Sequence, residues 1–387
     1  MNRPRILGSV GAIALLTAAC TTGSPAPSAL SELPPAEDEL NLVIWVGYAE
    51  DGSSDPAYDW VTPFENETGC QVNATDGLDS ANMVAQMATG NYDGVSASGD
   101  ATLRMIAAGT VAPVNLDLIP NYAGVFEGLK NQPHNTVDGV AYGVPHGRGA
   151  NVLLYNTDVF SEAPTSWDVV WEDAAAHSGE ISIWAYQNYI ADAALHLMTK
   201  NSDLGITDPY QLNDEQFAAA IALLEAQNDH VGQYWGGAQD QIDAFASGDM
   251  VVGTSWQYQY NVLSADTPVA VTLPDEGSTG WSDTWMIASD AAHPGCMYRW
   301  MNWMLKPDIS AMATVWFGEA PTSEAACEAA EALSPGHCYT FHATDEAYFD
   351  KIWFWSTPQS DCADDDPATT CKNIDEWTEA WTTITGG

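Results

Sequence analysis

Short apolar runs alternate with amphipathic runs along the first part of the chain. A short apolar run is typical of a buried strand, whereas apolar residues at helical spacing that stop at a glycine are typical of a helix. Because strand and helix follow one another repeatedly, we expect an α/β fold with a mostly parallel sheet. The pattern predicts strands at 42–46, 71–74 and 92–95, and helices at 60–67, 82–88 and 103–108.

The middle of the chain predicts a second lobe of the same kind. Asn213 followed by Gln216 has the pattern of a capping box, and apolar residues recur at helical spacing from Phe217 to Leu224. This combination predicts an amphipathic helix over 214–228. Further signals predict a short helix that ends at Gly248, a strand at 250–253, and a helix rich in Trp and Met at 298–305.

The N-terminus has the features of an export signal. Arg3 and Arg5 precede an apolar run from Ile6 to Leu16, and small residues then lead to Cys20. Such a run is too short to span a membrane in the mature protein, and no later stretch is apolar for about 18 residues. We therefore expect a signal peptide over the first 19 residues and an exported protein.

The cysteine that follows this signal resembles the cysteine of a bacterial lipobox. The resemblance implies that Cys20 is lipidated and becomes the new N-terminus. An ordinary signal peptide with an incidental cysteine is the alternative. Residues 20–40 are rich in Ser, Pro and Ala, and we expect them to form a disordered leash. The protein would then be held by its lipid at the outer face of the cytoplasmic membrane or in the periplasm.

The charge of the chain is strongly acidic. It has 10 Lys and Arg residues against 53 Asp and Glu residues, which gives a formal net charge of -43. Such a surface repels nucleic acid and anionic lipid headgroups, so we expect neither as a partner apart from the lipid anchor. It also concentrates small cations. Adaptation to salty surroundings explains the charge better, because a single binding site does not require so much of it.

The cysteines agree with export. Six remain after Cys20, and an even number in an extracellular chain indicates disulfides, although six cysteines allow fifteen pairings. Neither a CxxC motif nor a histidine-rich spacing supports zinc, so we expect no metal site and no cofactor. Two pairs are close in the sequence and would leave the last two cysteines for each other: Cys327–Cys338, Cys362–Cys371 and, across a long loop, Cys70–Cys296.

The order of short motifs along nearly the whole mature chain resembles the solute-binding proteins of ABC transporters. Within them it resembles the spermidine/putrescine-binding family. Each motif alone is weak, but so many in the same order are specific. They are Ile44-Trp45-Val46-Gly47-Tyr48, Phe64-Glu65-Asn66-Glu67-Thr68-Gly69, Tyr92-Asp93-Gly94-Val95, Tyr142-Gly143-Val144-Pro145, Leu154-Tyr155-Asn156, Pro164-Thr165-Ser166-Trp167, Phe245-Ala246-Ser247-Gly248, Trp256, Pro274-Asp275-Glu276-Gly277 and Trp281-Ser282-Asp283.

The resemblance implies a type II periplasmic-binding-protein fold. This fold has two α/β lobes, each a mostly parallel sheet flanked by helices, and holds its ligand in the cleft between them. The chain would cross between lobes near Pro145 and Trp281, which puts Cys70 and Cys296 in the same lobe, as a bridge between them requires. Lobe one would comprise 41–144 and 282–330, and lobe two 145–281 and 331–387.

The resemblance also implies which residues face the ligand. A polyamine is a methylene chain with ammonium groups, so it needs aromatic walls and carboxylates at matched distances. Most of the 16 tryptophans must nevertheless be structural. Carried over from the family, the aromatic positions fall on Trp45, Tyr48, Trp256 and Trp281, the carboxylate on Asp283, a polar contact on Ser98, and Asp100 replaces an aromatic residue.

The chain departs from the family pattern at the other end of the ligand. Tyr186 and Tyr189 occupy the positions of an acidic pair, which removes two charges. Arg148 lies where the family has an aromatic residue; in the cleft it would oppose a diamine or bind an anionic group of the ligand. Pairing with an acid at the hinge is its alternative role. Glu319, near another family contact, could restore one of the lost charges.

These features favour a monomeric receptor that captures a polyamine or a related organic cation and delivers it to a membrane permease. Its lobes would close around the ligand without making or breaking bonds. A second hypothesis keeps the receptor but takes a zwitterion, such as a betaine, an opine or an aminophosphonate. Tyr186, Tyr189 and Trp281 would then cage its cationic end, and Arg148 would hold its anionic end.

Two weaker hypotheses complete the set. Tyr258 and Tyr260 offer phenolate ligands for ferric iron. An extracellular carboxylate-pair hydrolase is the alternative of another class, but no nucleophile elbow, HExxH or Ser-x-x-Lys signature supports an enzyme.

Overall fold

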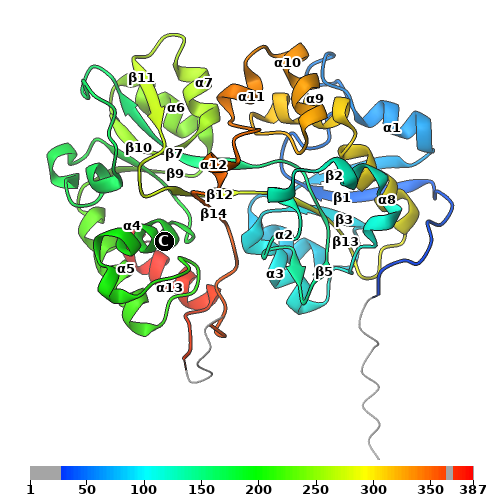
Figure 1. Cartoon of the computed structure of the whole chain (residues 1–387), viewed down its shortest axis with the longest axis horizontal. Coiled ribbons are helices and arrows are strands. Elements are labelled where there is room, and N and C mark those ends of the chain that lie inside the picture. Colours follow the sequence, from blue (N-terminus) through cyan, green and yellow to red (C-terminus); the bar gives the residue numbers. More distant parts are fainter. Residues whose placement is uncertain (1–27, 363–368, 387) are drawn as a thin grey trace, which may run out of the picture.

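The computed structural model describes residues 28–362 and 369–386, and these form two lobes side by side (Figure 1). The predicted signal peptide, the lipidation site Cys20 and the first part of the predicted leash lie outside the described residues. Within the described residues, no helix combines the length and the apolar character needed to cross a membrane.

Lobe one is built on a sheet with the strand order β2-β1-β3-β13-β6. The strands are β1 (Glu39–Ile44), β2 (Gln71–Asp76), β3 (Gly94–Ala97), β6 (Val144–Pro145) and β13 (Thr284–Ile287). The helices around it are α1 (Val61–Thr68), α2 (Ser80–Met87), α3 (Gly99–Ala108) and α8 (Pro294–Met304).

Lobe two is built on a sheet with the order β14-β12-β7-β10-β8-β9, and β11 also pairs with β7. The strands are β7 (Gly149–Asn156), β8 (Ile181–Trp184), β9 (Val231–Trp235), β10 (Val252–Trp256), β11 (Val269–Thr272), β12 (Ser278–Trp281) and β14 (Ile352–Phe354). The helices are α4 (Tyr189–Lys200), α5 (Asp214–Asn228), α6 (Ala238–Ser247), α7 (Gln257–Leu263) and α13 (Ile374–Thr385).

Further short elements connect the lobes or cover them. The hairpin β4 (Thr136–Val137) and β5 (Val140–Ala141) precedes β6. The helices α9 (Pro307–Phe317), α10 (Glu324–Leu333), α11 (His337–Thr340) and α12 (Glu346–Phe349) follow α8. The 3-10 helices are η1 (Leu116–Leu118), η2 (Pro120–Gly124), η3 (Glu127–Leu129), η4 (Trp167–Val170), η5 (Ala174–His177) and η6 (Ser202–Leu204).

The helices expected from the sequence form where their end signals lie. Gly69 ends α1 in the left-handed conformation with φ 81°, and Gly109 ends α3 in the same way with φ 69°. The capping box of Asn213 and Gln216 begins α5. In lobe one, Trp300 of α8 packs edge-to-face against Phe64 of α1, which joins these helices in the core of the lobe.

The chain passes between the lobes at two neighbouring points, and it crosses a third time, back to lobe two, between α8 and β14. It leaves lobe one after β6 and enters lobe two at β7, and it returns between β12 and β13. Gly149 of β7 pairs with Trp281 of β12, and Pro145 of β6 pairs with Thr284 of β13. The first two crossings therefore run side by side. The lobe boundaries expected at the level of single residues remain a prediction.

The sheets are mixed, which differs from the expected mostly parallel sheets. Some parallel pairs join strands that helices connect, such as β1 with β2 and β8 with β9, whereas β12 and β14 are parallel although they lie far apart in the chain. The antiparallel pairs involve β13, which enters lobe one from the other lobe, and β7, which enters lobe two. The strands next to the crossings thus form antiparallel pairs, which in lobe two lie in the middle of the sheet. This is a consequence of topology that local periodicity does not reveal.

The disulfides have the pairings that the sequence indicated. The structure joins Cys70 to Cys296, Cys327 to Cys338 and Cys362 to Cys371. The first bridge links the start of β2 to α8 over a sequence separation of 226 residues. The other two close short loops.

The expectation of a disordered leash through residue 40 is wrong for its last part. The strand β1 already begins at Glu39, and Leu40 is fully buried. The Glu37 carboxylate accepts hydrogen bonds from the backbone N–H groups of Gly295 and Cys296, at the N-terminus of α8. An acid at a helix N-terminus satisfies free N–H groups and the helix dipole, so this segment is fixed to the lobe.

Candidate functional site

A cavity of about 320 Å³ lies between residues of the two lobes. The lobe-one side brings carboxylates, hydroxyls and apolar side chains, and the lobe-two side brings mainly indoles. Among the described residues, no lysine or arginine lines this cavity. Its lining is Trp45, Val46, Gly77, Leu78, Asp79, Ser80, Ser98, Asp283 and Phe317 together with Trp184, Tyr186, Gly236, Gly237, Trp256, Trp281 and Trp355.

Asp283 is the buried carboxylate of the cavity. It follows β12 at the second crossing, and its side chain accepts hydrogen bonds of 2.6 Å from the hydroxyls of Tyr48 and Ser98. Tyr48 comes from the turn after β1, and Ser98 from the end of β3. Burial raises the pKa of Asp283 to about 6, and the charge of Asp100 acts in the same direction, whereas both hydroxyls lower it.

Asp100 connects the two lobes behind the cavity. Its carboxylate accepts a hydrogen bond of 3.0 Å from Ser80 of α2 and one of 2.9 Å from the hydroxyl of Tyr186. Tyr186 follows β8 of lobe two, so the second bond spans the junction between lobes. Burial raises the pKa of Asp100, although both hydrogen bonds oppose the shift. This bond joins lobe two to the acidic side of the site.

Four indoles form the lobe-two wall. Trp184 stacks on Trp355 with ring centroids 4.5 Å apart and an interplanar angle of 6°. Trp281 lies 6.0 Å from Trp355, and Trp256 lies 5.7 Å from Trp281 and 6.3 Å from Trp184. Gly149 permits this packing, because a Cβ there would lie 2.2 Å from the Trp281 ring. The wall offers electron-rich faces to a cation and apolar surface to a methylene chain.

Glu319 and His146 lie beneath the acidic side. The Trp285 indole donates a hydrogen bond of 3.0 Å to Nδ1 of His146, so Nε2 carries the hydrogen and lies 3.4 Å from the Glu319 carboxylate. Burial lowers the pKa of His146 to about 3. Burial and the neighbouring Asp283 raise the pKa of Glu319 well above its ordinary value. Burial therefore favours a neutral Glu319, which would not restore a missing negative charge.

The expected site residues divide into three groups. Trp45, Ser98, Tyr186, Trp256, Trp281 and Asp283 line the cavity. Tyr48 and Asp100 lie behind it and hydrogen-bond to lining residues, and Glu319 lies deeper, outside the lining. Tyr189 and Arg148 are not brought to the cavity. That the lining residues contact the ligand remains a prediction.

Tyr189 belongs to the core of lobe two. Its ring stacks on Trp171 at 5.2 Å, and its hydroxyl accepts a hydrogen bond of 3.0 Å from Gln227. It is the first residue of α4, where the helical direction turns it into the lobe. The expected pair of phenols at the cleft therefore reduces to Tyr186.

Arg148 is buried beside the first crossing and pairs with an acid there. Its guanidinium donates to the Glu346 carboxylate at 2.8 Å and to the carbonyl of Ala343 at 3.1 Å. It also stacks over the ring of Phe349 at 3.6 Å. These contacts correspond to its alternative role at the hinge, and they hold it away from the cavity because its charge is already compensated.

Sequence reasoning missed Trp184 and Trp355, which make half of the indole wall. Trp184 is the last residue of β8, and the carboxyl ends of parallel strands are where α/β folds bind ligands. The position of Trp184 at the end of a predicted strand could therefore have identified it as a candidate lining residue. Trp355 follows β14, which joins the sheet of lobe two from the C-terminal segment, so its location depends on a long-range pairing.

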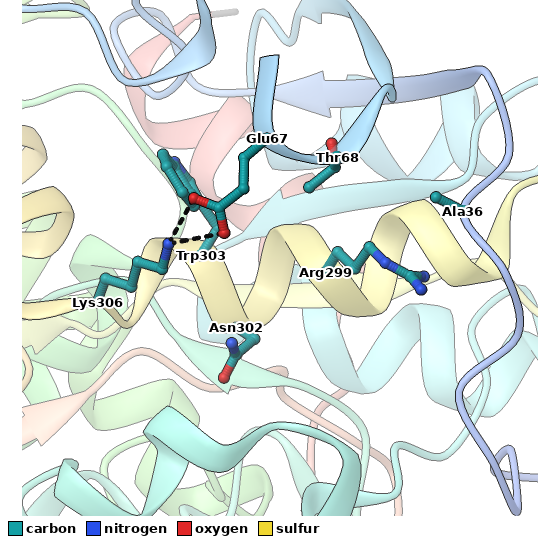
Figure 2. Close-up of a pocket in the computed structure, with 7 residues that line it drawn as sticks. All are labelled: Ala36, Glu67, Thr68, Arg299, Asn302, Trp303 and Lys306. Atoms are coloured by element: carbon teal, nitrogen blue, oxygen red, sulfur yellow. Dashed lines mark hydrogen bonds and ion pairs between the residues drawn. The ribbon is translucent and has the colours of Figure 1, made fainter. Parts of the chain in front are cut away.

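A second hollow, of about 380 Å³, lies in lobe one between α1 and α8 (Figure 2). Arg299 and Lys306 line it, and Lys306 lies 3.1 Å from the Glu67 carboxylate and 3.8 Å from the ring centre of Trp303. Two cations against one acid do not suit a cationic ligand. The charge of the lining therefore favours the cavity at Asp283.

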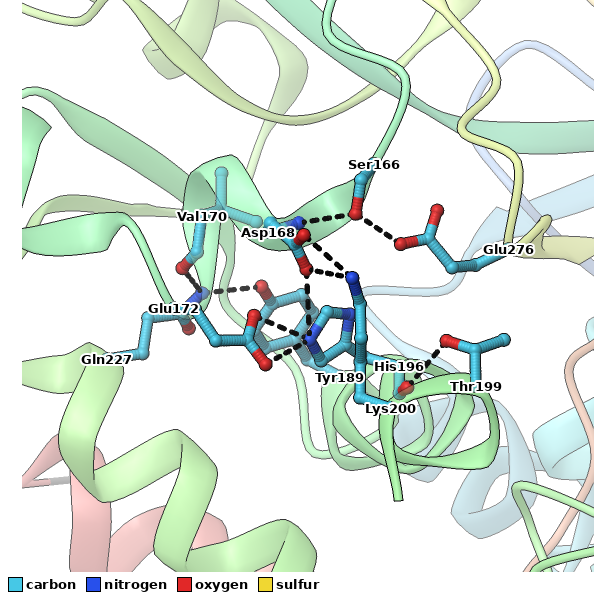
Figure 3. Close-up of polar contacts among 10 residues, drawn as sticks. All are labelled: Ser166, Asp168, Val170, Glu172, Tyr189, His196, Thr199, Lys200, Gln227 and Glu276. Carbon is cyan, nitrogen blue, oxygen red and sulfur yellow. Dashed lines mark hydrogen bonds and ion pairs between the residues drawn. The ribbon is translucent and has the colours of Figure 1, made fainter. Parts of the chain in front are cut away.

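A cluster in lobe two groups side chains of the kind that bind metals (Figure 3). Asp168, His196 and Glu276 each direct one ligand-type atom to within 4.8 Å of the others. The cluster contains its own cation, however, since the Lys200 ammonium lies 2.7 Å from Asp168. His196 lies 2.7 Å from Glu172. These contacts are typical of an ion-pair network rather than of an open metal site. The network joins α4 to Asp168 and Glu172, which precede it in the chain, and lies beside Glu276, which precedes β12.

Comparison with known proteins gives related sequences over most of the chain. The putrescine/agmatine-binding protein of Pseudomonas aeruginosa is 24% identical over 289 residues, which cover 70% of this chain and 77% of that protein. The spermidine/putrescine-binding periplasmic protein of Escherichia coli is 24% identical over 313 residues, which cover 78% of this chain and 85% of that protein.

Solved structures share the fold. A spermidine/putrescine ABC transporter substrate-binding protein from Streptococcus pneumoniae has a TM-score of 0.69 at 17% identity, covering 90% of this chain and 97% of that one. A binding protein from A. tumefaciens in complex with glucopine has a TM-score of 0.65 at 18% identity, covering 90% and 99%. The two-lobe fold is therefore that of periplasmic binding proteins.

A family model supplies the assignment. The model described as bacterial extracellular solute-binding protein matches residues 59–336, which include the first two crossings and most residues of the cavity lining. The chain therefore belongs to the family of bacterial extracellular solute-binding proteins.

Proposed function

We propose that this exported solute-binding protein captures a polyamine or a related organic cation and delivers it to the permease of an ABC importer. The observation that carries the proposal is the lining of one cavity by the buried carboxylate of Asp283 and the indoles of Trp256 and Trp281, without lysine or arginine among the described lining residues. Indoles attract a desolvated cation by about 2 kcal/mol each, and a carboxylate pairs with its charge.

The relatives support the same ligand class. Proteins named for putrescine, agmatine and spermidine match this chain over at least 70% of its length. The shared feature is a methylene chain with cationic groups, and the indole wall with a carboxylate at one side suits that chemistry. A lipid anchor at Cys20 and a monomeric state complete the proposal and follow from the sequence features described above.

A zwitterionic ligand has less support. It would need a cationic partner for its anionic end, and Arg148 is engaged by Glu346 outside the cavity. Asp283 and the indoles could bind the cationic end of such a ligand. Its anionic end would have no lysine or arginine to pair with among the described lining residues.

Isothermal titration calorimetry with putrescine, spermidine and spermine tests the ligand class. Glycine betaine and γ-aminobutyrate serve as zwitterionic controls of similar size. We expect at least one of the three polyamines to bind, and the zwitterions to bind at least tenfold more weakly. Binding of a zwitterion alone, or of none of the polyamines, would refute the proposed ligand.

A further inference from the structure

Trp256 is held from behind the indole wall by a side-chain amide. Its Nε1 donates a hydrogen bond of 3.1 Å to Oδ1 of Asn151, which lies opposite on β7. An indole N–H is a donor only, so the oxygen of the Asn151 amide has to face it. The orientation of this amide therefore follows from chemistry, and its Nδ2 has to point the other way.

The amide nitrogen of Asn151 begins a directed chain. Nδ2 donates to the hydroxyl of Thr279 at 2.6 Å. Because that hydroxyl has a single hydrogen, it donates it onward to the carboxylate of Asp192, at 3.0 and 3.1 Å from the two oxygens. The direction runs from Trp256 through Asn151 and Thr279 to Asp192, and a carboxylate is the acceptor that ends such a chain.

The members of the chain are buried and come from separate elements. Asn151 is 4% exposed, Thr279 is fully buried and Asp192 is 8% exposed. They belong to β7, β12 and the first turn of α4, so both crossing strands take part. None of the three lines the cavity. Water does not compete for their hydrogen bonds at such burial, and each can act on a ligand only through the wall.

We propose that Asn151, Thr279 and Asp192 are positioning residues, which set the orientation of the Trp256 indole in the wall of the ligand cavity. The proposal rests on the proposed function, because it assigns a role in binding the organic cation. A cation over an indole is bound through the face of the ring, so a tilt of the ring weakens the contact. The crossing strands carry the relay, which ties the wall to the part of the molecule that bends when the lobes close.

Thr279→Val is the most selective change. Valine has nearly the shape of threonine but lacks the hydroxyl, so Asn151 loses its acceptor and Asp192 loses its donor. The amide is then fixed only by its bond to the Trp256 N–H, so the amide and the indole can tilt together. Thr279→Ser keeps the hydroxyl and is the matched control. Asn151→Leu removes both bonds of the amide and serves as a second test if the valine variant does not fold.

A double-mutant cycle separates positioning from a general structural effect. We expect Thr279→Val to weaken spermidine binding about fivefold in calorimetry, which corresponds to one hydrogen bond of about 1 kcal/mol, and Thr279→Ser to keep the affinity. In a Trp256→Phe background, which has no indole N–H, Thr279→Val should not change the affinity further. An equal loss in both backgrounds would overturn the proposal.

A measurement without ligand keeps this test independent of the ligand class. The indole Nε1–H resonance of Trp256, identified by its absence in Trp256→Phe, should shift and exchange faster with solvent in Thr279→Val and in Asn151→Leu. An unchanged resonance in these folded variants would overturn the relay. If the resonance moves as expected but no polyamine binds the unmodified protein, the relay stands and the proposed ligand fails.

Discussion

The protonation of Asp283, the buried carboxylate of the cavity, depends on its hydrogen-bond partners. Asp283 is buried, yet it keeps hydrogen bonds to Tyr48 and Ser98, which stabilise its ionised form. A cationic group of a ligand would add the compensation that a buried carboxylate lacks. Asp283 is the buried carboxylate of the lining, so its protonation should be visible in the pH dependence of ligand binding.

Asp283→Asn tests this charge directly. The variant keeps the shape of the side chain but removes its charge, so we expect spermidine affinity to fall about 10- to 100-fold, as for the loss of a charge-assisted hydrogen bond. Asp290→Asn, an exposed acid of the same lobe, is the matched control and should change the affinity less than threefold. Calorimetry at pH 8 provides the measurement.

The same carboxylate predicts a pH dependence of binding. Burial raises its pKa to about 6, and the cation binds the ionised form. Affinity should therefore fall as the pH decreases through about 6 and should level off above about 7. In Asp283→Asn this step should disappear. A step that persists unchanged in the variant would mean that another group titrates.

For Arg148 we predict an effect on stability rather than on ligand affinity. Its guanidinium pairs with Glu346 and stacks over Phe349, outside the cavity. Arg148→Ala should lower the melting temperature, because the buried guanidinium loses its packing on Phe349 and its bonds to Glu346 and to the carbonyl of Ala343. It should leave polyamine affinity within about threefold. Thermal unfolding and calorimetry measure the two effects. A large loss of affinity with unchanged stability would instead indicate that Arg148 contacts the ligand.

At the scale of elements, the site is assembled at the ends of strands and at the crossings. Trp184 is the last residue of β8, Trp256 of β10 and Trp281 of β12. Three indoles of the wall therefore lie at the carboxyl ends of strands of one sheet. Asp283 follows directly after the last of these. The residues proposed to contact the ligand therefore lie next to the crossings, where a hinge motion would bring the two sides of the cavity together.

The disulfide between β2 and α8 belongs to this scale. Cys70 and Cys296 both lie in lobe one, but the chain between them spans 226 residues and includes most strands of lobe two, so the bridge restricts the unfolded chain strongly. Replacing both cysteines by alanine should cost about 2–5 kcal/mol of the free energy of unfolding in urea. Polyamine affinity should be unchanged, because the bridge lies outside the cavity lining. An unchanged unfolding midpoint would contradict a stabilising role.

Much of this element-scale arrangement could be predicted from the sequence, and the exceptions have physical reasons. Helix ends at Gly69 and the capping box at Asn213 are local signals, and the structure has both. Trp256, Trp281 and Asp283 line one cavity, as the family pattern implied. The direction of the Arg148 side chain depends on α12, whose Glu346 lies 198 residues further along the chain. The place of Trp355 depends on the pairing of the preceding strand β14 with β12, which lies much earlier in the chain. Local patterns contain no such pairing.

At the scale of the whole molecule, the net charge of -43 dominates. With 10 Lys and Arg residues in the full sequence, most acids lack a cationic neighbour, so the folded state repels itself. Salt screens this repulsion over distances of about 10 Å at 0.1 M. The protein should therefore be more stable in salt, which fits adaptation to salty surroundings.

Thermal unfolding in sodium chloride tests this account of the charge. Between about 0.02 M and 1 M salt, where screening shortens from beyond 10 Å to about 3 Å, the melting temperature should rise. Choline chloride at the same ionic strengths separates screening from specific sodium binding. A melting temperature that stays constant or falls in both salts would show that self-repulsion does not limit stability.

The central claim is that the cavity at Asp283 binds an organic cation between a carboxylate and a wall of indoles. A crystal structure of the protein with spermidine tests it most directly. We expect an ammonium group within hydrogen-bond distance of the Asp283 carboxylate and methylene groups against Trp256 and Trp281. Spermidine bound elsewhere, for example in the hollow beside Glu67, with this cavity left without it, would contradict the claim.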